Sequence, residues 1–102
     1  DTFIAMYVLQ KTDVFNEWLK RLRDKKALAR IVFRMTKMEM GLLGDYKSIG
    51  DGISEIRIDY GPGYRLYFTK KNNVIIVLLI GGDKSTQSRD IAKAKILLKG
   101  ED

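Results

Sequence analysis

The chain lacks both cysteine and histidine, and it contains a single proline among its 102 residues. Without cysteine there can be no disulfide, no thiolate metal ligand and no cysteine nucleophile. Without histidine the most common general base and the most common metal ligand are both missing. Any catalysis must therefore rely on lysine, arginine, tyrosine or carboxylate side chains, and we expect neither a metal nor a cofactor.

Long apolar segments are also lacking. No run approaches the roughly 20 apolar residues that span a bilayer, and the N-terminus lacks the basic-then-apolar order of a secretory signal. We therefore expect a soluble protein of the cytoplasm. The length indicates one domain, which we place at residues 6–100, with residues 1–5 as an N-terminal extension.

Positive charge is in surplus, because 19 lysines and arginines stand against 13 aspartates and glutamates and give a net charge of +6. Such a surplus attracts polyanions, nucleic acids among them. The alternative is a basic surface that serves only solubility.

The spacing of the apolar residues predicts an α+β chain. A short strand over residues 6–10 precedes a helix capped at Thr12-Asp13, and a second helix follows and ends at Gly41. Residues 41–52 contain several glycines and no sustained period, so we expect a connecting loop there.

The second half of the chain is predicted to form three strands and a helix. Residues 53–60 and 64–70 alternate between apolar and polar side chains and form a hairpin around a glycine-proline-glycine turn. Residues 74–80 are apolar throughout, as in a central strand that is covered on both faces and ends at two glycines. Ser85 or Thr86 caps a last helix. The predicted order is β-α-α-β-β-β-α.

The predicted hairpin places two arginines on one face of the sheet. If its turn has three residues, Asp59 pairs with Arg65 and Arg57 pairs with Tyr67, so the two arginines are diagonal neighbours. Two guanidiniums and a tyrosine on an open face suit a phosphate, because the planar fork of arginine matches two phosphate oxygens. The alternative is a neutral charge ladder, in which Asp59 pairs with Arg65 and Glu55 pairs with Arg57.

Residues 81–85, Gly-Gly-Asp-Lys-Ser, join the predicted central strand to the last helix. Glycines let a backbone approach a phosphate, helix N-termini attract anions, and Lys84 adds a mobile positive charge. The spacing of the glycines before the lysine is wrong for a P-loop. The alternative is a tight turn followed by a capped helix.

A basic stripe is predicted on the second helix. Its members recur at helical spacing and can follow a phosphate backbone, although a solvated helix face is the alternative. They are Lys26, Arg30, Arg34 and Lys37.

Three stretches of the chain resemble a known family. Residues 54–68, SEIRIDYGPGYRLYF, closely resemble the addiction-module killer proteins, a HigB-like group within the RelE/ParE toxin superfamily. Residues 81–87, GGDKSTQ, and residues 90–95, DIAKAK, resemble the C-terminal signature of the same group. The likeness covers nearly the whole chain.

The resemblance implies a RelE-like fold, in which a helical hairpin packs on a small antiparallel sheet whose concave face meets messenger RNA in the ribosome. It implies the toxin of a type II toxin–antitoxin module, a ribosome-dependent and metal-independent mRNA endoribonuclease that arrests growth. The implied partners are the ribosome, the messenger RNA and a cognate antitoxin with a helix-turn-helix.

Matched by motif, the residues that bind the phosphate and stabilise the transition state are Arg57, Arg65 and Lys84. The basic stripe of the second helix and Tyr67 are expected to bind RNA. One departure concerns the base, because some nucleases of the RelE branch place a tyrosine in the C-terminal helix and residues 88–98 contain none. The general base is therefore open among Lys84, Glu55, Asp59, Asp83 and Tyr67.

Two other functions stay open at this point. A ParE-like gyrase inhibitor has the same fold without catalysis, and the missing tyrosine favours it, whereas the matched arginines and lysine favour the nuclease. A basic nucleic-acid-binding module without toxicity is the third possibility.

Overall fold

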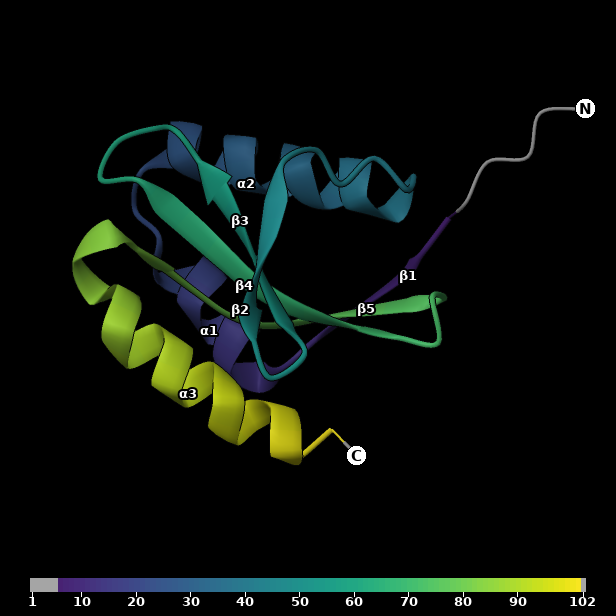
Figure 1. Cartoon of the computed structure of the whole chain (residues 1–102). Helices are drawn as coiled ribbons and strands as arrows, with labels where there is room; N and C mark the ends of the chain where they lie inside the picture. The colour runs from purple at the N-terminus through teal and green to yellow at the C-terminus, as the bar shows by residue number, and fades with distance from the viewer. Residues whose placement is uncertain (1–5, 102) are drawn as a thin grey trace, which may run out of the picture.

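The computed structural model describes residues 6–101, and the predicted N-terminal extension at residues 1–5 lies outside the described residues. Residues 6–101 form one five-stranded sheet and three α-helices (Figure 1). None of these helices is long and apolar enough to cross a membrane. The elements in chain order are β1 (Val8–Lys11), α1 (Asp13–Arg21), α2 (Lys25–Glu39), β2 (Tyr46–Gly50), β3 (Ile53–Ile58), β4 (Tyr64–Lys71), β5 (Ile75–Asp83), the 3₁₀ turn η1 (Lys84–Thr86) and α3 (Gln87–Lys99).

The sheet has the strand order β1-β5-β4-β3-β2. Neighbouring strands run antiparallel except at one edge, where β1 runs parallel to β5. A parallel pair needs a long crossover connection. Here the connection consists of residues 12–74, which contain α1, α2 and the three strands β2, β3 and β4.

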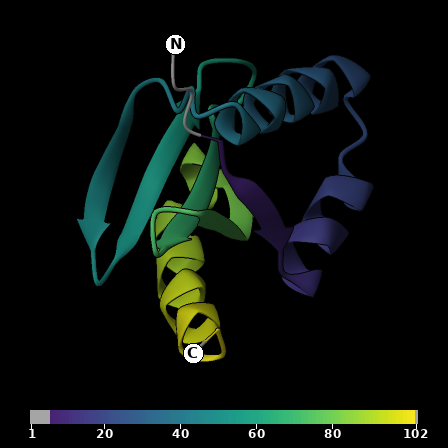
Figure 2. The ribbon, with the colours of Figure 1, turned by 90° about the vertical axis from the view of Figure 1, so that its right-hand side faces the viewer.

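The hairpin of α1 and α2 covers one face of the sheet (Figure 2). Each helix begins where a side chain accepts from a free backbone N–H: Thr12 from Phe15 at 3.0 Å, and Asp24 from Ala27 at 3.1 Å. Each large apolar side chain that is fully buried beneath the helices contributes about 1.5–3 kcal/mol. The predicted α+β fold with a helical hairpin on a small sheet is confirmed. The fully buried core residues on this face are Phe15, Ala27, Ile31, Met38, Ile56, Leu66, Phe68, Ile76 and Leu78.

Helix α3 covers only part of the opposite face. Its buried Ala94 shares a core with Tyr67 of β4 and Val77 of β5, and the helix packs mainly on those two strands. Much of β2 and β3 is therefore left uncovered on this face, where Lys47 and Arg57 are exposed.

An edge strand occupies part of the segment that was predicted to be a loop. The sequence predicts a loop over residues 41–52, but Tyr46–Gly50 form β2 at the outer edge of the sheet. Every side chain of β2 is exposed except the half-buried Ile49. A strand with no buried face carries no apolar alternation, so periodicity could not detect it.

Strand β5 extends past its predicted end, through Gly81 and Gly82 to Asp83. Both glycines are explained by close packing on opposite faces of the sheet. A Cβ atom on Gly81 would overlap the ring of Trp18, and a Cβ atom on Gly82 would overlap the carboxylate of Asp90. The two glycines therefore allow α1 and α3 to pack closely against β5.

The start of the last helix also differs from the prediction. Helix α3 begins at Gln87, and Thr86 holds the N-cap position without a side-chain cap bond. The preceding turn η1 is capped instead by Asp83, whose carboxylate accepts from the backbone N–H of Ser85 at 2.8 Å.

Candidate functional site

The β3–β4 hairpin determines where the two candidate arginines lie. Arg57 pairs directly with Arg65, two positions away from the predicted register. The predicted pairs, Asp59 with Arg65 and Arg57 with Tyr67, are therefore wrong, and the arginines are direct rather than diagonal neighbours. The reason is the turn, which spans residues 59–63 and contains two glycines at φ values of 56° and 81°.

A buried carboxylate lies between the two arginines. Oε1 of Glu55 accepts a hydrogen bond from Nε of Arg57 at 2.8 Å and another from Nη1 of Arg65 at 3.1 Å. Oε2 accepts from Nε2 of Gln87 at 3.1 Å. The carboxylate thus joins β3, β4 and α3. One of the two ion pairs of the alternative charge ladder forms, between Glu55 and Arg57. The other does not, because Arg65 pairs with Glu55 and not with Asp59.

The environment of Glu55 keeps its carboxyl ionised. Burial raises its pKa, but the hydrogen bond from Arg57 and the positive charges of Arg65, Arg57 and Lys47 lower the pKa by more. The resulting pKa is below the ordinary value, because opposite charges and donated hydrogen bonds favour the charged form. Glu55 is therefore a fixed anion and a weak base.

The two arginines differ strongly in their access to solvent. The side chain of Arg57 is 57% exposed and that of Arg65 is 9% exposed. Among residues 6–101, Arg57 bonds only through Nε, which leaves both of its Nη groups free to bind a phosphate. Arg65 lies beneath, with Nε buried and without a partner among the described residues.

Tyr67 is fully buried beside Arg65. Its hydroxyl has no hydrogen-bond partner within residues 6–101. Burial, reinforced by the negative charge of Glu55, raises the pKa of Tyr67 to about 12. As it lies, this phenol stays protonated and is out of reach of RNA, so its predicted RNA contact requires the region to open.

A groove of about 700 Å³ lies between α2 and the start of β2. It brings together three predicted residues from distant parts of the sequence: Arg34, Lys37 and Arg57. Lys47 and Tyr46 also line it, and the sequence did not predict a role for either of them. The signal that could have found Lys47 is its position directly opposite Glu55, which becomes visible only once β2 is recognised.

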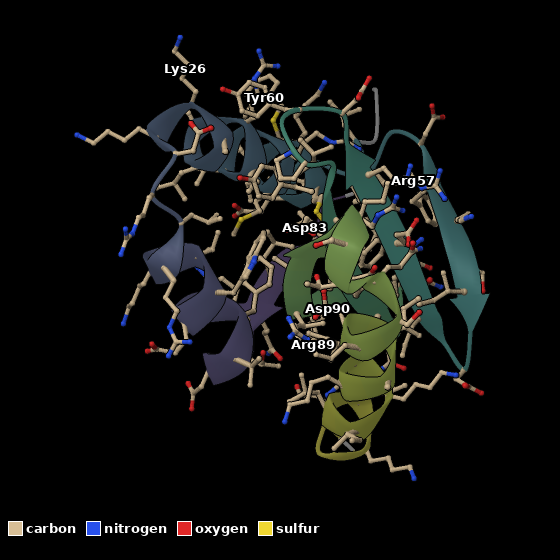
Figure 3. All side chains as sticks on the ribbon, turned by 90° about the vertical axis from the view of Figure 1, so that its left-hand side faces the viewer. Lys26, Arg57, Tyr60, Asp83, Arg89 and Asp90 are labelled. Atoms are coloured by element: carbon tan, nitrogen blue, oxygen red, sulfur yellow. The ribbon has the colours of Figure 1, made fainter. Side chains whose placement is uncertain are left out.

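The predicted basic stripe of α2 divides into two parts. Arg34 and Lys37 face the groove. Arg30 instead stacks over the ring of Tyr60, with its guanidinium carbon 4.5 Å from the ring centroid. Lys26 is exposed near Tyr60 and apart from Arg57 (Figure 3). A strand of RNA that follows the stripe would therefore run from the β3–β4 turn to the groove.

Lys84 is exposed in η1 and lies next to the β3–β4 turn. A Cβ atom on Gly63 would be 3.6 Å from Cβ of Lys84, and the preceding residue, Asp83, pairs with Tyr64. Lys84 is thus at the same end of the sheet as Arg57 but outside the groove. The N-terminus of η1 is already capped by the carboxylate of Asp83, and Lys84 and Arg89 are exposed cationic side chains around this turn.

A family profile and a sequence relative each match most of the chain. The profile of the family described as "Phage derived protein Gp49-like (DUF891)" matches residues 17–99. A Haemophilus influenzae protein described as an uncharacterized protein is 47% identical over 89 residues, which cover 87% of this chain and 90% of that protein.

A solved structure supports the fold independently. A doubly substituted form of the E. coli toxin RelE in the free state has a TM-score of 0.70 to this chain at 13% identity, covering 89% of this chain and 95% of that one. At this identity the similarity concerns the fold alone. The chain therefore has a RelE-like fold and belongs to the Gp49-like family of phage-derived proteins.

Proposed function

We propose that the protein is the toxin of a type II toxin–antitoxin module and cleaves messenger RNA on the ribosome, like the HigB-like group that it resembles. The observation that carries this proposal is the exposed Arg57, which is backed by Arg65 and lines a groove with more basic than acidic side chains. A fold shared with RelE is compatible with the proposal but does not decide it, because function depends on the site.

The groove suits a single strand of RNA. Its cations come from α2, β2 and β3 and include Arg34, Lys47 and Arg57. Cations in such an arrangement follow a phosphate backbone and release its counterions. Tyr46 is 42% exposed at the groove wall, where an aromatic ring can stack on a base.

In the proposed reaction, the 2′-oxygen attacks the adjacent phosphorus and forms a new P–O bond, while the bond from phosphorus to the 5′-oxygen breaks. A 2′,3′-cyclic phosphate forms, and the departing 5′-oxygen takes a proton from water. Negative charge accumulates on the phosphoryl oxygens in the transition state. A fixed guanidinium at those oxygens lowers the activation free energy by about 2.7–4 kcal/mol. Arg57 has the free Nη groups for this role. Lys84, which lies next to the β3–β4 turn, adds a positive charge at the same end of the sheet, and Arg65 supports Arg57 from beneath.

The proton of the 2′-hydroxyl must pass to a base, and burial or existing contacts argue against three of the five candidates. Tyr67 and Glu55 are buried, and Asp83 caps η1. Asp59 and Lys84 are exposed near the arginines, and we propose that one of them accepts the proton. The ribosome would orient the RNA and supply what this open site lacks.

The proposed partners are the ribosome, its messenger RNA and an antitoxin with a helix-turn-helix, all in the cytoplasm. The test is expression of the chain in a bacterium, followed by primer extension on cellular messages. Growth arrest with new 5′ ends inside translated messages supports the proposal, whereas normal growth or intact messages would overturn it.

A ParE-like gyrase inhibitor is the second candidate. The absence of a tyrosine from α3 favours it, because a non-catalytic toxin needs no base. Growth arrest with intact messages and with accumulated DNA breaks would identify this function. A nucleic-acid-binding module without toxicity would produce neither effect.

A further inference from the structure

We propose that Glu55 is a positioning residue that holds Arg57 with its free guanidinium edge toward the groove. What Arg57 binds rests on the proposed function. The positioning itself can be measured without any RNA, so the two ideas can fail separately.

The contacts of Glu55 come from three elements. The carboxylate is fully buried and accepts from Arg57 on its own strand, from Arg65 on β4 and from Gln87 at the start of α3. Both oxygens are therefore fixed, and the carboxylate cannot follow the motion of an exposed side chain. Gln87 belongs to the GGDKSTQ segment, and this contact gives that glutamine a role.

The bond to Arg57 has a specific geometry. An exposed arginine samples many rotamers, and ordering it on binding costs conformational entropy. The 2.8 Å bond from Nε to Glu55 restrains the end of the side chain before any ligand arrives. Because the guanidinium is planar, fixing the Nε edge also fixes the direction of the two Nη groups.

Arg65 has a different role in the same cluster. Its side chain is almost fully buried, so it reaches a ligand in the groove only after the cluster opens. What it does in the present arrangement is to compensate the charge of Glu55 at 3.1 Å, which keeps that carboxylate ionised. Arg65 therefore acts through Glu55 on Arg57.

Electrostatics and positioning predict opposite effects of removing the negative charge. A carboxylate close to a phosphate site repels the phosphate, so the variant Glu55→Gln should bind RNA as well as or better than the wild type if charge alone matters, and it should also cleave faster. If Glu55 positions Arg57, the same variant should cleave more slowly in spite of equal or tighter binding.

Two measurements separate these cases. The first is nitrogen-15 NMR of the arginine side chains, in which the Nε–H of Arg57 should exchange slowly with solvent in the wild type and faster in Glu55→Gln. The amide oxygen is a weaker acceptor than the carboxylate, and the amide NH₂ cannot accept from Gln87. The second combines the single-turnover cleavage rate on programmed ribosomes with the dissociation constant for a short single-stranded RNA. Asp51→Asn is the matched control, because it also removes a carboxylate from the β2–β3 hairpin. The carboxylate of Asp51 forms an exposed ion pair with Lys95 at 3.2 Å and does not contact Arg57.

We expect Glu55→Gln to lower the saturating cleavage rate by about 10- to 100-fold, the scale of a small misplacement of a catalytic group, with the dissociation constant unchanged or lower. Asp51→Asn should leave the rate and the Arg57 signal unchanged. Slow Arg57 exchange that persists in Glu55→Gln, or a folded Glu55→Gln that cleaves at the wild-type rate, would overturn the inference.

A second variant keeps the test decisive if Glu55→Gln does not fold. Gln87→Met removes only the bond to Oε2, from a half-buried side chain, and should produce a smaller change of the same sign in both measurements. Unchanged Arg57 exchange and an unchanged rate in Gln87→Met would count against the inference. If the wild type does not cleave RNA at all, the proposed function fails, and the NMR measurement still decides the role of Glu55.

Discussion

Arg57 and Arg65 lie directly opposite each other on β3 and β4, and a single carboxylate oxygen of Glu55 accepts a hydrogen bond from each. Two adjacent guanidiniums that share one counter-ion leave a net positive charge at the surface. Because Arg57 is the exposed member and Arg65 the buried one, substitutions at the two positions should have different consequences.

Arg57→Ala should lower cleavage on programmed ribosomes by about 10² to 10³, the usual loss for one transition-state donor. The free energy of unfolding should change little, because the side chain is more than half exposed. Arg23→Ala, at an exposed arginine between the two helices of the hairpin, is the control and should cleave normally. Normal cleavage by folded Arg57→Ala would remove the catalytic assignment.

Arg65→Ala should destabilise the protein as well as slow cleavage. Removing one partner of a buried ion pair costs about 3–5 kcal/mol, and the lower end applies here because Glu55 keeps its bonds to Arg57 and Gln87. Urea unfolding measures this change. The double variant Arg65→Ala with Glu55→Gln should lose less stability than the two single changes add up to, because it leaves no buried unpaired charge.

The hairpin and its arginines could be predicted from sequence because they depend on local patterns. Alternation along residues 53–60 and 64–70 places Arg57 and Arg65 on one face whichever way the strands pair. The register could not be predicted, since it depends on whether the turn uses three or five residues, and both fit a segment with two glycines.

The rest of the site depends on contacts between distant parts of the chain. Glu55 was predicted only as a possible base or as a partner of Arg57. The sequence does not show that Gln87, thirty-two positions away, donates a hydrogen bond to its carboxylate. The groove likewise needs β2, whose exposed edge position removes the apolar period that would reveal it. Local periodicity thus finds the elements, whereas burial and the shared carboxylate come from packing.

The groove cations should determine how RNA binding depends on salt. For single-stranded RNA each phosphate contact contributes about 0.7 to the slope of log K against log salt. Lys47→Ala should therefore lower that slope by up to about 0.7, because Lys47 lines the groove. Lys20→Ala, at an exposed lysine on α1, is the matched control and should leave the slope unchanged. A fall of the same size in Lys26→Ala would extend the RNA path along α2.

Tyr67 should make the folded state sensitive to alkaline pH. Its pKa is raised to about 12 in the folded protein, above an ordinary value near 10, so its contribution to stability is complete below pH 10 and is lost as the pH rises toward 12. Tyr67→Phe should reduce this loss when unfolding is followed between pH 9 and 12. At neutral pH the variant should be as stable as the wild type or more stable by about 1–3 kcal/mol, because it removes a buried hydroxyl without a partner among residues 6–101.

Lys84 and Asp59 are the two remaining candidates for the general base. Substitutions that keep or remove the charge of each side chain should distinguish them by their cleavage rates. Both side chains are exposed, so substitution should leave the melting temperature nearly unchanged. If Lys84 supplies only positive charge to the phosphate, Lys84→Arg should retain most of the single-turnover rate and Lys84→Met should lose about 10²-fold or more. Asp59→Asn should then also slow cleavage, by about 10² to 10⁴, the usual contribution of a general base.

If Lys84 is the base, Lys84→Arg should be as slow as Lys84→Met, because arginine does not give up its proton near neutral pH, and Asp59→Asn should cleave normally. Wild-type rates in both Lys84→Met and Asp59→Asn would mean that neither residue takes part in the chemistry and that the ribosome supplies the base.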